Sequence, residues 1–263
     1  MQVQALNTPI VKPGQALRPI IRQAIQQVYP AGLPEKSVLV VTSKIIAYAQ
    51  GRLVAMDMSL DHDQQRSVKQ ALVKQEADLY LDPQGSQYQL MLTVTNHTLA
   101  VNAGLDESNA DEHYVLWPQA IYGEVVKIWQ DLRQDFAVKE VGVIITDSRS
   151  IPLRWGVVGT ALASCGFQPL NDRIGDLDLF GRPITMVKVN VAEALAVAGV
   201  LEMGEVDEQT PLALVTDSSM VQFMDRPLND DEIDQLNIDL ADDMYGPLLN
   251  HVPWQKGGGQ GSK

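Results

Sequence analysis

The spacing of apolar and polar residues predicts a chain that mixes helices and strands in an irregular order. Apolar residues recur at helical spacing over Gly14–Tyr29 and over Trp117–Phe136. Continuous apolar runs at Ser37–Val41 and Val138–Ile145 indicate strands buried on both faces. Further predicted helices are a short one ending near Gln50, then Gln64–Tyr80, the alanine-rich Val191–Met203 and Leu228–Tyr245. Further predicted strands or extended segments are Gln2–Leu6, Tyr88–Val94, Thr98–Val101, Pro152–Cys165, Ile184–Val191 and Pro211–Val215.

The order of these elements favours an α+β fold with mixed or antiparallel sheets and packed helices. A doubly wound parallel sheet would require a stricter alternation of strand and helix. The chain has 263 residues, which suffice for one large core or for two interleaved subdomains. We expect residues 1–250 to form a single functional unit and the glycine-rich residues 255–263 to form a disordered tail.

Composition narrows the set of partners and compartments. The formal net charge of −13 disfavours nucleic acid and anionic membranes as partners. No apolar run reaches the roughly 18 residues of a membrane span, and the amino-terminal segment lacks the pattern of a signal peptide. These features predict a cytoplasmic protein. The single cysteine, Cys165, lies among apolar residues, which predicts a buried and unreactive thiol.

Two polar segments follow apolar strands and carry the strongest indication of chemistry. Asp106 and Asn109 belong to the sequence NAGLDESN, residues 102–109, and Asp147 and Ser148 follow the apolar run that ends at Ile145. Carboxylates at the ends of buried strands are suited to hold a hard metal ion beside a phosphate. Taken singly, each segment is equally compatible with an ordinary polar turn or a helix cap.

Two other segments allow the same pair of interpretations. Thr42-Ser43-Lys44 joins a buried strand to a helix, where free backbone N–H groups, a hydroxyl and an ammonium suit a phosphate. The alternative is a hydroxyl helix cap followed by a solvated lysine. Glu205, in the acidic segment after Met203, is either a third metal carboxylate or an exposed loop acid.

Several common active-site motifs do not occur in the sequence. It contains neither a GxxxxGK[ST] phosphate loop nor a GxGxxG motif after a strand. It also lacks HExxH and GxSxG, and its four histidines are scattered through polar segments. A zinc site or a Ser-His-Asp hydrolase therefore has little support.

In combination, the polar segments resemble the CofE-type family, the GTP-dependent γ-glutamyl ligases of the deazaflavin coenzyme F-420. The resemblance extends from about Leu6 to Asp217 and implies the CofE-like ligase fold. Its landmarks are VLVVTSKII (38–46), VNAGLDESN (101–109), VGVIITDS (141–148), DLFGRPI (178–184) and EMGEVDEQTP (202–211).

The resemblance implies roles for individual residues. It assigns Asp106 and Asp147 to a first divalent cation, Ser148 and Glu205 to a second, and makes Arg154 a candidate catalytic residue beside the two aspartates. It also assigns a set of residues to the guanine nucleotide. These are Thr8, Pro9, Ile10, Val11, Ser43, Lys44, Asn109, Met203, Gly204, Glu205, Val206, Asp207, Glu208, Gln209 and Thr210.

The implied reaction joins L-glutamate to a carboxylate-bearing acceptor such as the coenzyme F-420 precursor. GTP would phosphorylate the acceptor carboxylate, and the glutamate amine would attack the resulting acyl phosphate. Two Mg²⁺ or Mn²⁺ ions suit the oxygen ligands, and K⁺ is a further candidate cofactor. The resemblance also implies a homodimer.

Two departures from the family pattern motivate an alternative. A lysine that is common in the family four residues after Lys44 is Tyr48 here, and residues 149–155 lack the usual Phe-Gly-Arg-Pro-Trp-Arg-like sequence. The alternative is a nucleotide- and metal-binding homologue with a different acceptor or without ligase activity. A purely structural dimer module is a third, weaker hypothesis.

Overall fold

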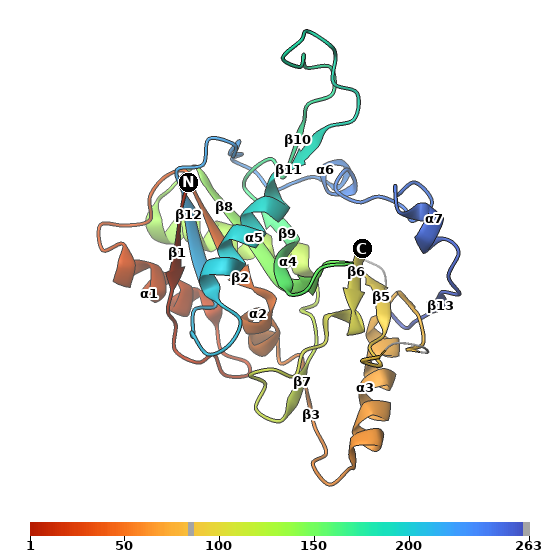
Figure 1. The fold of residues 1–263 in the computed structure, drawn as a ribbon. Helices are drawn as coiled ribbons and strands as arrows, with labels where there is room; N and C mark the ends of the chain where they lie inside the picture. The colour runs from red at the N-terminus through yellow and green to blue at the C-terminus, as the bar shows by residue number, and fades with distance from the viewer. Residues whose placement is uncertain (84–86, 260–263) are drawn as a thin grey trace.

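A central mixed sheet organises the molecule, which a computed structural model describes for residues 1–83 and 87–259 (Figure 1). The sheet has five strands in the order β1-β12-β2-β8-β9. β2 and β8 run parallel at its centre, and the other neighbours are antiparallel. The strands are β1 (Gln2–Leu6), β2 (Ser37–Thr42), β8 (Val141–Ser150), β9 (Val157–Cys165) and β12 (Leu212–Thr216).

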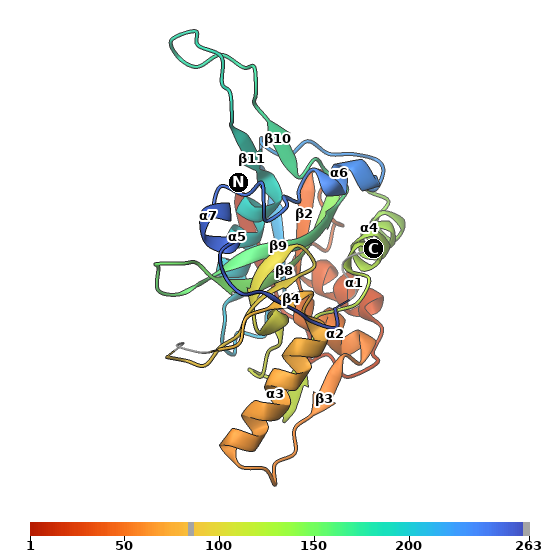
Figure 2. The same cartoon turned by 90° about the vertical axis from the view of Figure 1, so that its right-hand side faces the viewer.

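Helices cover both faces of this sheet, which explains the continuous apolar sequences of its central strands (Figure 2). α1 (Leu17–Val28) and α4 (Ile121–Phe136) pack on one face. α5 (Val191–Met203) packs on the other, where a side chain at Gly199 would collide with Val40. The small residues of α5 therefore allow it to lie close to the sheet.

A second, smaller sheet has the order β13-β4-β5-β6 and packs with α3 (His62–Glu76) around a separate apolar cluster. This cluster includes Met91, Leu105 and Tyr114. Its strands are β4 (Leu79–Tyr80), β5 (Leu92–Thr95), β6 (Thr98–Val101) and β13 (Gln255–Lys256). The remaining elements are α2 (Ser43–Gln50), β3 (Leu53–Ala55), a 3₁₀ turn (Asn102–Gly104), β7 (His113–Val115), β10 (Leu170–Asp172), β11 (Lys188–Asn190), α6 (Asp230–Asp234) and α7 (Gly246–Leu249).

The predicted α+β class is confirmed, and several predicted elements appear with nearly the expected bounds. The alanine-rich helix occupies Val191–Met203 as expected, and Gln2–Leu6 forms an edge strand. Cys165 is buried, and its burial raises the pKa of the thiol to about 12. Within residues 1–83 and 87–259, no helix combines the length and apolar character needed to cross a bilayer.

The predicted terminal helix Leu228–Tyr245 is wrong for most of its length. Only Asp230–Asp234 forms a helix, started by a capping box in which Asn229 and Glu232 bond each other's backbone N–H. This short helix buries no side chain, so no apolar stripe extends it.

Other boundaries moved because local signals compete with hydrophobic spacing. The helix expected from Trp117 begins at Ile121, directly after the left-handed backbone of Ala120. Pro118 also disfavours helical geometry in Trp117, the residue before it. The helix expected to reach Tyr80 ends at Glu76. The strand expected to end at Ile145 continues to Ser150.

Three further segments differ less. The strand expected at Tyr88–Val94 begins at Leu92, and the extended segment expected from Pro152 becomes a strand only at Val157. Of the strand expected at Ile184–Val191, the part Lys188–Asn190 forms a strand.

The carboxyl-terminal segment differs from the expected disordered tail in its described part. Gln255 and Lys256 pair with β4 as β13. The N–H groups of the next three glycines donate to carbonyls at the end of α3 and just beyond it, at 2.9–3.0 Å. A Cβ at Gly257 would overlap the Ala77 carbonyl, so glycine is what permits this approach. Residues 260–263 of the predicted tail lie outside the described residues.

Candidate functional site

The candidate site lies at the edge of the central sheet where β2 and β8 leave their paired region. These strands are parallel, and Thr42 is in register with Thr146. The residues that follow, Ser43 and Lys44 on α2 and Asp147 and Ser148 on β8, therefore emerge at the same edge. The sequence placed these residues at the ends of elements, where side chains can converge, and the parallel pairing of β2 and β8 brings them together.

The loop that carries Asp106 reaches this edge through an unusual backbone. Asn102, Ala103 and Gly104 all have positive φ angles, and a Cβ at Gly104 would overlap the indole of Trp117. That indole donates from Nε1 to Oδ2 of Asp147 at 2.6 Å. Gly104 thus makes room for the side chain that holds Asp147 in place.

Lys44 connects α2 to this loop. Its Nζ lies 2.6 Å from Oδ2 of Asp106 and donates to the Ser108 carbonyl at 2.9 Å. Ser108 in turn donates to Oδ1 of Asp106 from its backbone N–H and from its hydroxyl, each at 2.8 Å. Burial opposes ionisation of Asp106, but the bonds from Lys44 and Ser108 outweigh it and lower the pKa.

Asp147 behaves in the opposite way. Burial raises the pKa of this carboxyl to about 6, and the nearby negative charge of Asp106 adds to that effect. The bonds from Trp117 and from the Ser148 N–H, together with the charge of Lys44, oppose the rise without cancelling it. Asp106 and Asp147 are therefore two repelling carboxylates near one lysine that is ion-paired with Asp106, an arrangement that an additional cation would stabilise.

The predicted second pair is also in contact. The hydroxyl of Ser148 donates to Oε1 of Glu205 at 2.8 Å. Next to it, the Asn109 side-chain amide donates to the Val206 carbonyl at 2.6 Å. The 102–109 loop is thus connected to the segment that follows α5.

The segment Met203–Thr210 forms a compact turn that also holds the amino-terminal loop. Glu208 accepts a hydrogen bond from the Val206 N–H at 2.8 Å, and its carboxylate fills the space that a side chain at Gly204 would need. The Gln209 side chain donates to the Thr8 carbonyl at 2.8 Å, and Thr210 donates to the Met203 carbonyl at 2.5 Å. The segments predicted to line a nucleotide therefore lie side by side.

Not every predicted residue joins this group. Arg154 lies in the exposed turn between β8 and β9, where its guanidinium donates to the Leu153 carbonyl. Asp106, Asp147 and Glu205 do not form a closed metal cage, because no group of three or more acidic, histidine or cysteine side chains with metal-binding geometry occurs among the described residues.

The alternative of a solvated lysine does not describe Lys44, whose side chain is 27% exposed and ion-paired. Thr42 precedes α2 without a side-chain capping bond. Asp106, by contrast, does form a local polar turn with Ser108, so a turn and a functional carboxylate coexist in this loop.

Two residues that hold the aspartates, and one carboxylate beside Arg149, were not identified from the sequence. Trp117 and Ser108 hold the two aspartates, as described above. Glu193, in the first turn of α5, accepts from the Thr160 hydroxyl at 2.9 Å, and its other oxygen lies buried 3.9 Å from Arg149. The sequence signal for Trp117 was the proline that follows it. A residue before proline is disfavoured in helical geometry, which places Trp117 before α4.

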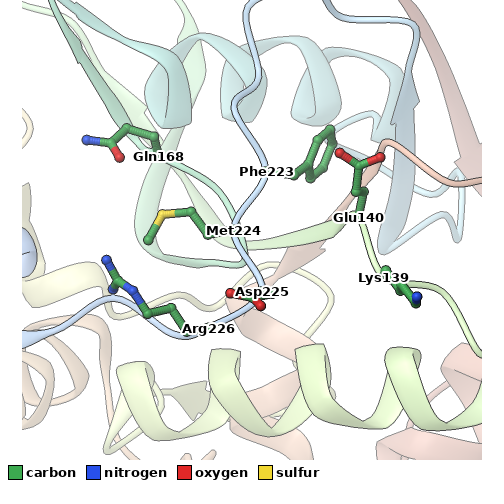
Figure 3. A pocket seen from close by; sticks show the side chains of 7 residues that line it. All are labelled: Lys139, Glu140, Gln168, Phe223, Met224, Asp225 and Arg226. Atoms are coloured by element: carbon green, nitrogen blue, oxygen red, sulfur yellow. The ribbon is translucent and has the colours of Figure 1, made fainter.

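A separate pocket lies elsewhere. It measures about 510 Å³ and includes Lys139 and Glu140, which precede β8 at the end opposite Asp147 (Figure 3). Arg226 lines it but is already engaged by both oxygens of Glu232 at 2.7 Å. None of the predicted site residues lines this pocket.

The group around Lys44 combines two carboxylates, a hydroxyl–carboxylate pair and one ammonium at a strand edge. Such a set can hold a divalent cation together with an anionic ligand, as enzymes that handle activated phosphates do. The chain belongs to the F420-0:gamma-glutamyl ligase family, whose model matches residues 5–217. It is accordingly an enzyme of the amide-bond-forming ligase class.

Curated relatives agree with this assignment. A coenzyme F420:L-glutamate ligase of Methanopyrus kandleri is 32% identical over 78% of this chain and 81% of its own length. Enzymes of the same name from Methanothermobacter thermautotrophicus and Methanocaldococcus jannaschii are each 28% identical. They cover 79% and 82% of this chain, and 84% and 87% of their own lengths.

Proposed function

We propose that this chain is a GTP- and divalent-metal-dependent glutamate ligase that acts on the coenzyme F-420 precursor or a related carboxylate. The observation that carries the proposal is the contact of Lys44 with Asp106 beside Asp147, at a strand edge, in a chain of the F420-0:gamma-glutamyl ligase family. The names of the relatives give glutamate and F420 as the reactants.

The donor set fits a magnesium or manganese ion that keeps part of its shell for water and phosphate. Mg²⁺ is commonly bound through one or two carboxylates plus substrate oxygens, so a closed three-acid cage is not required. Asp106 and Asp147 would hold one ion, and Ser148 with Glu205 a second. Such ions would neutralise charge on the phosphate oxygens during transfer.

The protein groups have distinct tasks in this scheme. Lys44 would release Asp106 and turn to the nucleotide phosphate, as its flexible side chain allows. Asn109 and residues 203–210 would line the nucleotide. The γ-phosphoryl group passes from GTP to an acceptor carboxylate oxygen with loss of GDP. The glutamate amine then attacks the acyl carbon, phosphate leaves, and the amine loses a proton.

The test is an assay that supplies L-glutamate, F420-0, GTP and Mn²⁺. It measures the mass of the product and the amount of phosphate released. Asp147→Ala should lower phosphate release by at least about a hundredfold while the protein stays folded. Glu112→Ala, on the neighbouring exposed loop, serves as the control and should retain activity. Full activity of Asp147→Ala would refute the metal assignment.

A nucleotide-binding homologue without ligase activity is the second candidate, favoured by Tyr48. Its hydroxyl lies 3.5 Å from the Asn109 carbonyl, so an aromatic side chain stands where the family commonly has a cation. Stabilisation by GTP and Mn²⁺ without any product of added glutamate mass would select this candidate.

We also propose that the protein acts as a homodimer. The turn joining β10 to β11 projects from the body and exposes Leu179 at 98% and Phe180 at 87% (Figure 1). Trp155, at the tip of the β8–β9 turn, is 93% exposed. Apolar side chains this exposed suit a second copy of the chain, and light scattering should give twice the 28.9 kDa monomer mass.

A further inference from the structure

A second pocket, of about 290 Å³, runs along α3 beside the 102–109 loop. Arg66 and Lys69 of α3 line it, together with Glu107 and Tyr114. The family resemblance assigns no role to these four residues, and the proposed nucleotide site does not include them. The pocket therefore has no role in the arrangement described so far.

The pocket and the candidate site share one wall. Glu107, which lines the pocket, directly follows Asp106. Tyr114, another lining residue, precedes Val115, whose backbone exchanges two hydrogen bonds with Asp106 at 2.8 and 3.0 Å. A ligand in the pocket would consequently lie next to the loop that presents Asp106.

The charges of the pocket differ from those of the whole protein. Arg66 and Lys69 are three residues apart on α3 and share a face, whereas Glu107 is the only acidic residue among the described residues that line the pocket. Lys69 pairs with Glu107 at 2.7 Å, and Arg66 pairs with Asp63 at 2.9 Å. Partly exposed pairs of this kind contribute little, so an anionic ligand can replace their acidic partners.

The lining of the pocket also includes apolar side chains. Tyr88 and Leu90 line it while remaining 61% and 40% exposed, and Met56 adds a further apolar side chain. Two cations beside an exposed aromatic ring match an anion that also carries an aromatic part. Because the whole chain has a net charge of −13, this local pair of cations favours binding of an anionic, aromatic reactant in the pocket.

We propose that this pocket binds the body of the carboxylate acceptor, with Arg66 and Lys69 contacting its anionic groups and Tyr88 its aromatic ring. This inference rests on the proposed ligase function and extends it. It places the 102–109 loop between the body of the acceptor and the nucleotide. The acceptor carboxylate would extend past Glu107 toward Asp106.

Charge-reversal variants test the inference, with F420-0 as the varied reactant at saturating GTP, L-glutamate and Mn²⁺. Lys69→Glu should raise the KM for F420-0 by about tenfold or more, and Lys69→Arg should keep it near the wild-type value. The stabilisation of Lys69→Glu by GTP and Mn²⁺, read as a shift in Tm, should equal that of the wild type.

Lys127→Glu is the matched control. Lys127 is exposed on α4, away from the pocket, and its replacement changes the net charge equally. The inference is overturned if Lys69→Glu leaves the KM unchanged, or if Lys127→Glu raises it as much. Lys69→Gln repeats the test without introducing a negative charge if Lys69→Glu does not fold. A wild-type protein that forms no product refutes the proposed function, and this inference with it.

Discussion

The two sheets of this protein support different parts of the candidate site and are built differently. Five of the six residues of β2 are buried, because helices cover the central sheet on both faces. The smaller sheet is buried on one side only, as the alternating burial of β5 indicates, and α3 buries only Val73 fully. Lys44 and Asp147 thus lie where strands covered on both faces end, and we expect them to move less than the smaller sheet, one face of which is exposed.

This difference has a chemical counterpart. In the proposed function, charges at the edge of the central sheet would meet a metal and a phosphate in a fixed geometry, so small displacements there should be costly. The proposed pocket for a larger organic acceptor would tolerate more movement. Local opening should accordingly be easier in the small sheet and α3 than in β2 and β8.

The largest effect should come from Gly104, where the two regions meet. Gly104→Ala must accept a φ of +71° and displace the Trp117 indole. We expect a loss of about 3 kcal/mol in the free energy of unfolding and a clear fall in kcat/KM, because Asp147 loses its donor. Urea unfolding and phosphate release measure the two effects.

Gly51→Ala is the control for this prediction. Gly51 has a similar φ of +68° but no atom near the added Cβ. It should lose only about 1 kcal/mol and retain activity. Equal losses in both variants would contradict the role given to Trp117 packing.

A smaller effect should appear in the pH dependence of stability. Burial raises the folded-state pKa of Asp147 from 3.8 to about 6. Ionisation of Asp147 therefore lowers the free energy of unfolding as the pH rises from 3.8 to about 6. Asp147→Asn should therefore stabilise the metal-free protein by about 2–3 kcal/mol above pH 6 and have little effect below pH 4. Urea unfolding in EDTA measures this.

Asp135→Asn should act in the opposite direction. The hydrogen bond from Arg18 lowers the pKa of Asp135, so its contribution is present at neutral pH and is lost as the pH falls through the lowered value. A wild-type protein more stable than Asp147→Asn at pH 7.5 would contradict the assigned environment of Asp147.

The smallest effect should follow Gly257→Ala at the edge of the small sheet. The added Cβ would overlap the Ala77 carbonyl and loosen the contact between the tail and α3. We expect about 1 kcal/mol of lost stability and faster amide exchange at the end of α3, with unchanged ligase activity. Unchanged exchange would mean that this contact does not order the helix end.

Much of the fold and part of the site could be predicted from sequence. Continuous apolar runs identified β2 and β8, and parallel pairing then brings Lys44 and Asp147 to one edge. The family resemblance linked Asn109 to the 203–210 segment, which the Asn109–Val206 bond matches in the structure.

The remainder depended on contacts that no local pattern encodes. Trp117 donates a hydrogen bond to Asp147 although the two are 30 residues apart in the sequence. Hydrophobic spacing predicts no contact at that sequence separation. The acidic segment after Leu228 has charges suited to a helix start but lacks an apolar face, so the predicted helix stops after one turn. The glycines after Lys256 suggested disorder, yet the missing side chains allow them to approach α3.

The central claim is that Asp106 and Asp147 hold the cation that binds GTP. Titration calorimetry of GTP in the presence and absence of Mn²⁺, on the wild type and on Asp147→Asn, tests it most directly. We predict that Mn²⁺ tightens GTP binding to the wild type at least about tenfold and has no such effect on the folded variant. Equal enhancement by Mn²⁺ in both proteins would contradict the claim.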